Sequence, residues 1–498
     1  MGAAATGSAA ERLRERLAPL SDLARVLQLL EYDQETAMPR AGAAARAQQS
    51  ATISGLLHEG MIHPEIVELL DAAEAEGVDG DDAALVREVR READKARRVP
   101  TELVRAMSMA SSAGQDGWAR ARADDDFAAF LPFLRHNLEL RREYAACFDV
   151  DEPYDALLDD FEPGMRAAEV RAVFGPLRDR LPALIASASE RSPGVPTGPF
   201  PEAGQRRAVD LLLARVGFEP ESWLLGESVH PFCVTPGRGD NRMTTRFSEN
   251  SLESVLSCLH EFGHALYEAQ IDPALDRTPL GMGVSMSVHE SQSRLWEVFV
   301  GGSLAFWRGA WPDFRQAMGP SVQGPGDQPE TFVRALMSVQ PSLIRVDADP
   351  VTYPMHIVLR FELEQAMLSG DLALEDLPGA WNDGMRDLLG VTVPDDRHGV
   401  LQDVHWSIGA FGYFPTYALG TLLAAQIWEA ARAGLPDLDA QLEAGDLAPL
   451  RGWLSEHVHA HGKRLTPREV IRTATGRDLD AGPYLDYARR RAEGSLGQ

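Results

Sequence analysis

Two histidines and a glutamate stand close together in the segment His260-Glu261-Phe262-Gly263-His264. Residues four apart on a helix lie on the same face, so the imidazoles of His260 and His264 can reach one ion if the segment is helical. Glu261 would then lie beside that ion and could accept a proton from a water molecule that attacks a carbonyl group. This pattern is typical of zinc hydrolases and predicts a catalytic zinc site.

The surrounding sequence predicts the helix that this spacing requires. Apolar residues recur mostly at intervals of three and four between residues 250 and 270, and no proline interrupts them before Pro273. They are Leu252, Val255, Leu256, Leu259 and Leu266. Two histidines would be costly to bury in such a helix without polar partners, and a metal ion is one such partner. An ordinary helix that carries two histidines is the alternative, and we favour the zinc site.

A catalytic zinc ion usually has three protein ligands, so a third ligand is expected. The segment His289-Glu290-Ser291 follows a glycine-containing turn and opens a second run of apolar residues at helical spacing. Glu290 is our candidate, on a second helix packed against the first. His289 is the alternative, either as the ligand or as a residue that contacts a ligand or the substrate, and spacing alone does not separate the two.

The composition is that of a globular protein of 498 residues, with 44% hydrophobic and 25% charged residues. Its net charge of -27 disfavours nucleic acid and anionic membranes as partners, because phosphate groups would be repelled. We recognise neither a membrane span nor a secretory signal. The three cysteines Cys147, Cys233 and Cys258 predict no disulfide framework and suit the cytoplasm. Cys258 would face away from His260 on a helix, so we expect it to be a buried structural residue.

Most of the chain is predicted to be helical. Helix formers with apolar residues at helical spacing fill residues 9–30, 41–58, 64–76, 81–98, 101–122, 127–147, 166–189 and 204–216. Strand-like sequences occur around residues 230–234 and 242–247, just before the metal helix. We therefore expect a mainly α fold with a small antiparallel sheet near the metal.

Five segments, taken in order, resemble the motifs of one enzyme family. They are Asp240–Thr244, His260–His264, His289–Ser293, Ile344–Asp349 and Gly399–Trp406. Together they resemble the carboxypeptidase Taq family of zinc metallocarboxypeptidases. The likeness extends from Tyr32–Pro39 near the start of the chain to the closing helices, so it covers nearly the whole sequence.

The resemblance implies a single large helical zinc-peptidase fold over residues 1–498, with a long substrate groove. A helical N-terminal part of about residues 1–200 would form one wall of the groove, and about residues 201–498 would carry the metal site. It also implies a homodimer that removes single residues from peptide C-termini with broad specificity. By resemblance, His260, His264 and Glu290 hold zinc, Glu261 is the general base, and cobalt can substitute for zinc.

A carboxypeptidase must also recognise the free carboxylate at the end of its substrate. Arginine suits this role because it is always charged and binds carboxylates in a bidentate manner. Arg345 and Arg242 are the candidates, since each lies in a segment that resembles a family motif. The alternative for either is a structural ion pair with Asp347, Asp349 or Asp240.

The tetrahedral intermediate of peptide hydrolysis needs a stabiliser for its oxyanion. We expect Tyr417 and His405 to serve in this role, and Tyr413 and His289 to contact the substrate. The alternative for both phenols is a packing role at the edge of the core.

Two further features bear on these expectations. The chain carries Asp347 and Pro350 where family members often have glutamates, and Tyr32 where tryptophan is common, so specificity is less firmly implied than chemistry. The alternating residues His457, His459 and His461 lie in a predicted helix over residues 454–465, where residues two apart do not share a face. We therefore expect no metal there.

Two other functions remain compatible with the sequence. An oligoendopeptidase or dipeptidase would use the same zinc chemistry and differ in how it binds the substrate's end. A helical peptide-binding protein with a structural zinc ion would need a fourth protein ligand, and no histidine or cysteine is obviously placed to supply one.

Overall fold

The computed structural model describes residues 7–194, 198–322 and 328–495. As far as residue 216, the described chain consists of α-helices joined by loops and one short 3-10 turn. They are α1 (Ala9–Thr36), α2 (Ala43–Met61), α3 (Pro64–Glu76), α4 (Gly80–Arg98), α5 (Thr101–Asp124), α6 (Phe127–Ala145), α7 (Pro153–Leu158), α8 (Ala167–Ser189) and α9 (Glu202–Val216). Every helix predicted in this region is confirmed, with ends shifted by a few residues. The short helix α7 was not predicted.

A three-stranded sheet follows, made of β1 (Trp223–Glu227), β2 (Cys233–Gly237) and β3 (Asp240–Thr245). The order across the sheet is β1-β3-β2. Strand β2 pairs with β3 in the antiparallel sense, but β1 pairs with β3 in parallel. The expected antiparallel sheet is therefore mixed, because the chain reverses direction twice between β1 and β3. Strand β1 was not predicted, since its sequence WLLGE lacks the alternation of a half-buried strand.

The rest of the chain is helical again. Its helices are α10 (Glu253–Ala269), α11 (Met286–Arg294), the π-helix η3 (Leu295–Val300), α12 (Leu304–Met318), α13 (Pro329–Leu336), α14 (Tyr353–Ser369), α15 (Leu377–Leu389), α16 (Pro415–Gly434), α17 (Leu438–Ala444), α18 (Ala448–His457), α19 (Pro467–Thr475) and α20 (Gly482–Ala492). Short 3-10 turns include η5 (Arg345–Asp347) and η7 (His405–Ile408).

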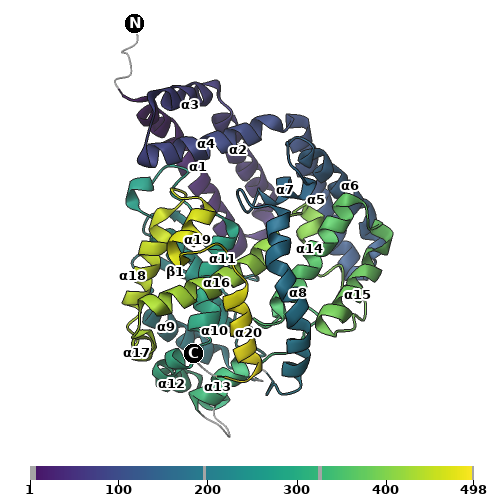
Figure 1. Cartoon of the computed structure of the whole chain (residues 1–498), viewed down its shortest axis with the longest axis vertical. Coiled ribbons are helices and arrows are strands. Elements are labelled where there is room, and N and C mark those ends of the chain that lie inside the picture. The colour runs from purple at the N-terminus through teal and green to yellow at the C-terminus, as the bar shows by residue number, and fades with distance from the viewer. Residues whose placement is uncertain (1–6, 195–197, 323–327, 496–498) are drawn as a thin grey trace.

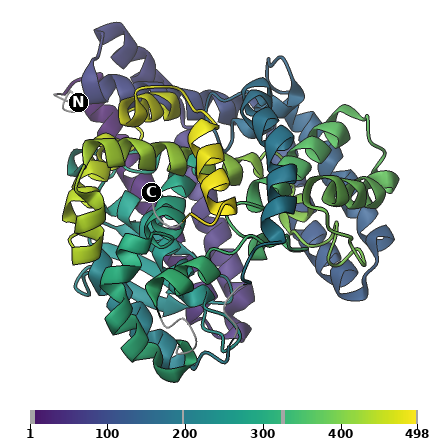
Figure 2. The ribbon, with the colours of Figure 1, turned by 60° about the horizontal axis from the view of Figure 1, so that its bottom comes forward.

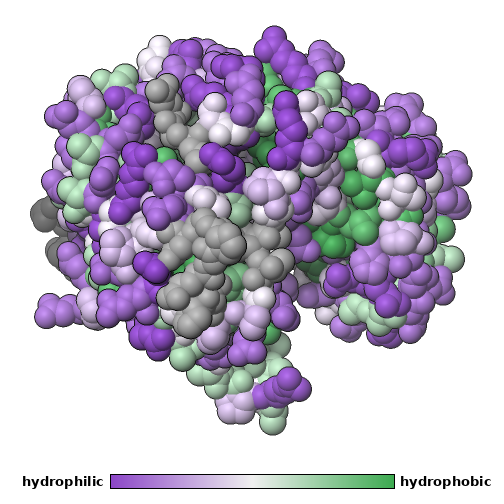
Figure 3. Space-filling view, turned by 90° about the horizontal axis from the view of Figure 1, so that it is seen from below, coloured by the Kyte–Doolittle hydropathy of each residue, from purple (hydrophilic) through white to green (hydrophobic). Residues whose placement is uncertain are grey.

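Helices from distant parts of the sequence surround the metal helix. Figures 1 and 2 show α5, α6 and α15 on one side of the molecule and α9 and α12 on the other. Helices α10, α11 and α16 lie between them, and α1 to α4 form one end (Figure 1). Seen from below, hydrophobic side chains gather in a hollow between two lobes of a mostly hydrophilic surface (Figure 3).

Helix α10 is deeply buried, as the predicted apolar face requires. Val255, Leu259 and Phe262 are completely buried, and Leu266 nearly so. Cys258 is buried as expected, and its thiol donates a hydrogen bond to the Val255 carbonyl (3.1 Å). The apolar face thus holds α10 in place and leaves its polar residues to line a site.

The predicted helix over residues 454–465 is wrong beyond His457. Helix α18 ends there, because His459 is drawn into the core between Gln270 Oε1 (2.6 Å) and Gln292 Oε1 (2.8 Å). His457 instead stacks on Trp453. Each of these two rings thus has its own protein partner. Among the described helices, none is long and apolar enough to cross a membrane.

Candidate active site

Glycines allow three helices to meet at unusually short range around the predicted metal ligands. A Cβ atom on Gly263 of α10 would lie 2.7 Å from Ser293 Cα of α11. A Cβ atom on Gly420 of α16 would lie 2.6 Å from both Cβ and Cγ of Glu290. Both distances are well inside van der Waals contact, so only glycine permits this packing. The close approach brings Glu290 to the face of α10 that carries the histidines.

The start of α11 is fixed by side chains that satisfy its free backbone N–H groups. Ser285 accepts a hydrogen bond from the Val288 N–H (3.2 Å). The buried carboxylate of Glu162 accepts bonds from both the N–H and the hydroxyl of Ser287 (2.5 Å each). An acidic group at a helix N-terminus is also favoured by the helix dipole. These contacts set the position of α11 and thereby of Glu290.

His260, His264 and Glu290 converge on one point, as predicted from the sequence. Glu290 Oε2 lies 3.8 Å from His260 Nε2 and 3.5 Å from His264 Nε2. The three possible ligand atoms all lie within 4.8 Å of one another. Ligands about 2 Å from a tetrahedral zinc ion are about 3.3 Å apart, so these separations suit an ion held between the three side chains.

The opposite ring nitrogen of His260 is held by a carboxylate. His260 Nδ1 lies 2.8 Å from Glu297 Oε2. Arg294 binds both carboxylates, through Glu290 Oε1 (2.8 Å) and Glu297 Oε2 (3.1 Å), and its guanidinium lies over the Tyr353 ring at 4.4 Å. A carboxylate on the far nitrogen fixes the tautomer of a metal-binding histidine and orients its ring. The Nε2 atom of His260 is thereby left facing Glu290.

The ring of His289 packs against the ring of His264. Its Nδ1 atom is 2.6 Å from His264 Nδ1, and its Nε2 atom is 3.3 Å from Glu268 Oε1. Glu268 also accepts a hydrogen bond from the Gly283 N–H (2.9 Å) and lies 3.6 Å from Arg25 of α1. Both nitrogens of His289 thus have protein partners, so it orients His264 in the way that Glu297 orients His260.

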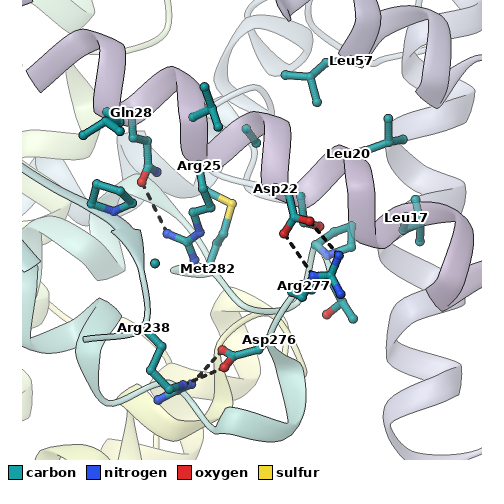
Figure 4. Close-up of a pocket in the computed structure, with 18 of the residues that line it drawn as sticks. Leu17, Leu20, Asp22, Arg25, Gln28, Leu57, Arg238, Asp276, Arg277 and Met282 are labelled. Carbon is teal, nitrogen blue, oxygen red and sulfur yellow. Dashed lines mark hydrogen bonds and ion pairs between the residues drawn. The ribbon is translucent and has the colours of Figure 1, made fainter. Parts of the chain in front are cut away.

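Arg25 ties the N-terminal helices to this network. It donates to the carbonyls of Thr235 (2.7 Å) and Gly281 (2.6 Å). It also lines an apolar cavity of about 700 Å³ between α1, α2 and the loop before α11. Figure 4 shows Arg25 between Gln28 and Met282 in the wall of this cavity. The other charged residues there form ion pairs with each other, including Asp22 with Arg277 (2.6 Å).

The electrostatics of the cluster suit metal binding. Burial lowers the pKa of His264 to about 4. Burial would raise the pKa of Glu290, but Arg294 and the histidines hold it well below its usual range. His264 is therefore neutral and Glu290 ionised at neutral pH, as metal ligands must be. His260 differs, because Glu290 and Glu297 outweigh the effect of burial and raise its pKa to about 9, so a metal ion that binds there at neutral pH must displace a proton from this ring.

Glu261 is 5% exposed and lies beside the three converging side chains. Burial raises its pKa to about 7, although the neighbouring His260 lowers it. A general base is most effective when its pKa lies near the working pH. The position and the pKa of Glu261 therefore both suit a residue that takes up and releases a proton.

The predicted oxyanion pair is brought together by η7 and α16. His405 Nε2 lies 3.2 Å from the Tyr417 hydroxyl. Burial lowers the pKa of His405 to about 4, so the ring is neutral. Burial and the charge of Glu290 raise the pKa of Tyr413 to about 12, and the rings of Tyr413 and Tyr417 are 5.2 Å apart. All three side chains can therefore act as neutral hydrogen-bond donors.

Arg345 forms a buried ion pair, but its partner is not one of the acids expected from the sequence. Its Nη2 atom lies 2.9 Å from Asp403 Oδ1, and its Nη1 atom donates to the Tyr353 hydroxyl (3.1 Å). Asp403 also binds the completely buried Arg360 (2.5 Å). Because Arg345 and Arg360 share the single carboxylate of Asp403, these three side chains keep an excess positive charge. The charge lies close to Tyr417, whose ring is 4.8 Å from the Arg345 guanidinium.

Arg242 is occupied elsewhere. Its guanidinium binds Asp240 through two hydrogen bonds of 2.7 and 2.8 Å and lies over the Tyr32 ring at 5.3 Å. This is the ion pair that we named as the alternative to substrate binding. Asp349 instead accepts hydrogen bonds from the backbone of Val351 and Thr352 at the start of α14.

Three residues that hold the site together, Glu297, Glu268 and Asp403, were not predicted from the sequence. Glu297 lies seven residues after Glu290, and Glu268 lies four after His264, so each shares a helix face with a predicted ligand. This spacing could have identified them. Asp403 could not be found in this way, because its contact with Arg345 joins residues 58 positions apart.

Two histidines of one helix, a glutamate of a second helix and a buried glutamate beside them define a helical metallopeptidase. The carboxypeptidase Taq (M32) metallopeptidase family matches residues 12–492. The chain therefore belongs to this family, and its function is that of a metallocarboxypeptidase.

Relatives and solved structures agree with this assignment over almost the full length. Thermostable carboxypeptidase 1 of Thermus thermophilus is 40% identical over 489 residues, which cover 94% of this chain and 95% of that protein. Carboxypeptidase 1 of Bacillus subtilis is 36% identical over 476 residues, covering 94% and 95%. The crystal structure of the M32 carboxypeptidase from Deinococcus radiodurans R1 matches with a TM-score of 0.93 at 38% identity, covering 97% of this chain and 99% of that one.

Proposed function

We propose that this metallocarboxypeptidase uses a zinc ion bound by His260, His264 and Glu290 to release single amino acids from peptide C-termini. The observation that carries the proposal is the convergence of the three ligand atoms within 4.8 Å, beside the buried Glu261. Cobalt is expected to substitute, because such sites discriminate poorly between divalent ions by affinity.

The donor set fits a catalytic ion better than a structural one. Within residues 7–194, 198–322 and 328–495, the group of potential ligands around His260 and His264 has three members. Structural zinc sites are closed by four protein ligands, whereas catalytic sites keep one position open. When bound, zinc would polarise the scissile carbonyl and lower the pKa of a water molecule.

The protein's own residues then have separate roles in hydrolysis. Glu261 accepts a proton from the attacking water and delivers it to the leaving amine. His405 and Tyr417 donate hydrogen bonds to the oxyanion of the tetrahedral intermediate, since both are neutral at working pH. Tyr413 contacts the substrate backbone.

Recognition of the free C-terminus is assigned to the region of Arg345. The excess positive charge of Arg345 and Arg360 over Asp403 supports this role, because a carboxylate would neutralise it. Arg242 is a weaker candidate, since its Nε and Nη2 groups already bind the two carboxylate oxygens of Asp240. His289 is reassigned from substrate contact to the support of His264.

Substitution of Glu261 by glutamine tests the proposal. The variant keeps the size of the side chain and should bind zinc, but kcat should fall at least about 10²-fold because the base is lost. Glu253→Gln, on the exposed first turn of the same helix, is the control. Hydrolysis by the Glu261→Gln variant at the wild-type rate would overturn the assignment.

The remaining features of the proposal concern the whole molecule. The chain is expected to act as one catalytic unit, with about residues 1–200 forming one wall of the substrate groove. It is further expected to be a cytoplasmic homodimer of broad specificity. The three free cysteines Cys147, Cys233 and Cys258 support a reducing compartment.

A further inference from the structure

A second cavity lies at the other end of the π-helix that follows α11. Its volume is about 490 Å³, and it lies between η3, the start of α12, α16, α17 and α20. Helix α20 runs beside α16 (Figure 1). No residue assigned above to metal or substrate lines this cavity.

The cavity is cationic although the chain as a whole is strongly acidic. Four arginines and two acids line it, in a protein with a net charge of -27. The arginines are Arg308, Arg432, Arg490 and Arg491, and the acids are Asp439 and Glu443. Arg308 pairs with Glu330 (3.0 Å) and Arg432 with Asp439 (2.7 Å). For Arg490 and Arg491, the described chain offers no carboxylate within ion-pair distance, and although Glu443 offsets part of their charge, the cavity wall keeps a net positive charge.

Two buried polar atoms in this cluster lack a well-formed hydrogen bond. The hydroxyl of Tyr487 lies close enough to the guanidinium of Arg491 to interact with it, but neither this hydroxyl nor the buried Nη2 atom of Arg491 makes a well-formed hydrogen bond with any described residue. A basic last turn is favourable at a helix C-terminus, which accounts for Arg489, Arg490 and Arg491 following one another. That effect does not explain why a guanidinium N–H is buried without an acceptor, which costs free energy.

Aromatic rings form another part of the cavity wall. The centroid of the Phe299 ring lies 4.9 Å from that of Tyr487 and 6.0 Å from that of Trp428. The guanidinium of Arg491 lies over the Tyr487 ring at 5.7 Å. The cavity thus combines cations that have no ion-pair partner with the faces and edges of three mutually tilted aromatic rings.

We propose that this cavity binds a small organic anion that carries a planar ring. Its carboxylate or phosphate group would bind Arg490 and Arg491, and its ring would pack against Phe299, Trp428 and Tyr487. Arginine forks bind such groups with two parallel hydrogen bonds, and the volume is in the range of small-molecule sites.

The position of this cavity connects it to the metal cluster. Val298 and Phe299 line it, and Val298 directly follows Glu297, which holds His260. A small molecule bound there would contact the π-helix that carries Glu297, the carboxylate that holds the predicted metal ligand His260. Such π-helical segments are often found at functional sites.

Binding can be measured by calorimetry on the metal-loaded protein with two probes. Phenyl phosphate and 3-phenylpropionate carry the same ring with different anionic groups, so their relative affinities distinguish a phosphate ligand from a carboxylate ligand. The variant Arg490→Gln/Arg491→Gln removes both cations and keeps the side-chain stems. The matched control is Arg489→Gln, on the same helix but outside the cavity, where Arg489 pairs with Glu493 (3.1 Å).

The double variant should bind the preferred probe at least about tenfold more weakly than the wild type, and the control should bind it normally. A second variant, Trp428→Leu, keeps both arginines and should weaken binding of the ring-bearing probe while leaving inorganic phosphate unaffected. The proposal is wrong if the wild type binds neither probe at millimolar concentration. It is also wrong if the double variant, with an unchanged melting temperature, binds both probes as the wild type does.

Discussion

Replacing Gly263 by alanine should separate the two helices that carry the metal ligands. The new methyl group would lie 2.7 Å from Ser293 Cα and 2.8 Å from the Gln292 carbonyl carbon, both in the backbone of α11. Ordinary contacts between such atoms are about 3.5–4.0 Å, so α10 and α11 must move apart by about 1 Å. Glu290 lies on α11, while His260 and His264 lie on α10.

A shift of this size is large compared with what a metal site tolerates. Metal–ligand distances are defined to within about 0.2 Å, so zinc affinity should fall at least about tenfold. Overpacking should also lower the free energy of unfolding by about 1–3 kcal/mol, partly offset by the better helix propensity of alanine.

Zinc affinity is measured by competition with a chromophoric chelator, and stability by thermal unfolding of the metal-free protein. The control is Gly379→Ala, since an added Cβ atom on this exposed residue of α15 would have no neighbour within 4 Å. The control should bind zinc normally and be stabilised by up to about 1 kcal/mol. If Gly263→Ala matches the wild type in both measurements, the close approach of α10 and α11 does not set the geometry of the metal ligands.

Three further substitutions probe other parts of the structure. Glu297→Gln should weaken zinc binding about 10- to 100-fold by removing the carboxylate that holds His260, and an unchanged dissociation constant would count against this role. Burial raises the pKa of Glu364 from 4.5 to about 7, so the folded state binds more protons than the unfolded state in this window. Glu364 alone should therefore lower the free energy of unfolding by about 3 kcal/mol as pH rises from about 4.5 to 7, so the difference in unfolding free energy between the wild type and Glu364→Gln should change by this amount across the range. Asp403→Asn should lower the free energy of unfolding by about 3–5 kcal/mol, because two buried arginines lose their shared carboxylate; a loss below about 1 kcal/mol in urea denaturation would contradict this.

The parts of the site that depend on local geometry were predictable from the sequence. His260 and His264 share a face because they are one helical turn apart, and the apolar residues around them define which face is buried. The choice between His289 and Glu290 was not predictable from spacing, because adjacent residues on one helix both approach α10. The three-dimensional arrangement gives each a different neighbour: Glu290 faces both Nε2 atoms, and His289 faces His264 Nδ1.

Features that depend on long-range contacts could not be predicted. We named Asp347 and Asp349 as possible partners of Arg345 because they are close in sequence, but the observed partner is Asp403. The helix predicted beyond His457 failed for the same reason, since burial of the His459 ring overrides local helix propensity. The parallel pairing of β1 with β3 likewise depends on tertiary packing.

The central claim is tested most directly by mass spectrometry of an N-acetylated peptide during digestion. The zinc-loaded protein should shorten the peptide one residue at a time from its C-terminus. The same peptide should remain intact with a chelator present, with a C-terminal amide, or with the Glu261→Gln variant. Internal cleavage, release of dipeptides or equal cleavage of the amidated peptide would contradict the account.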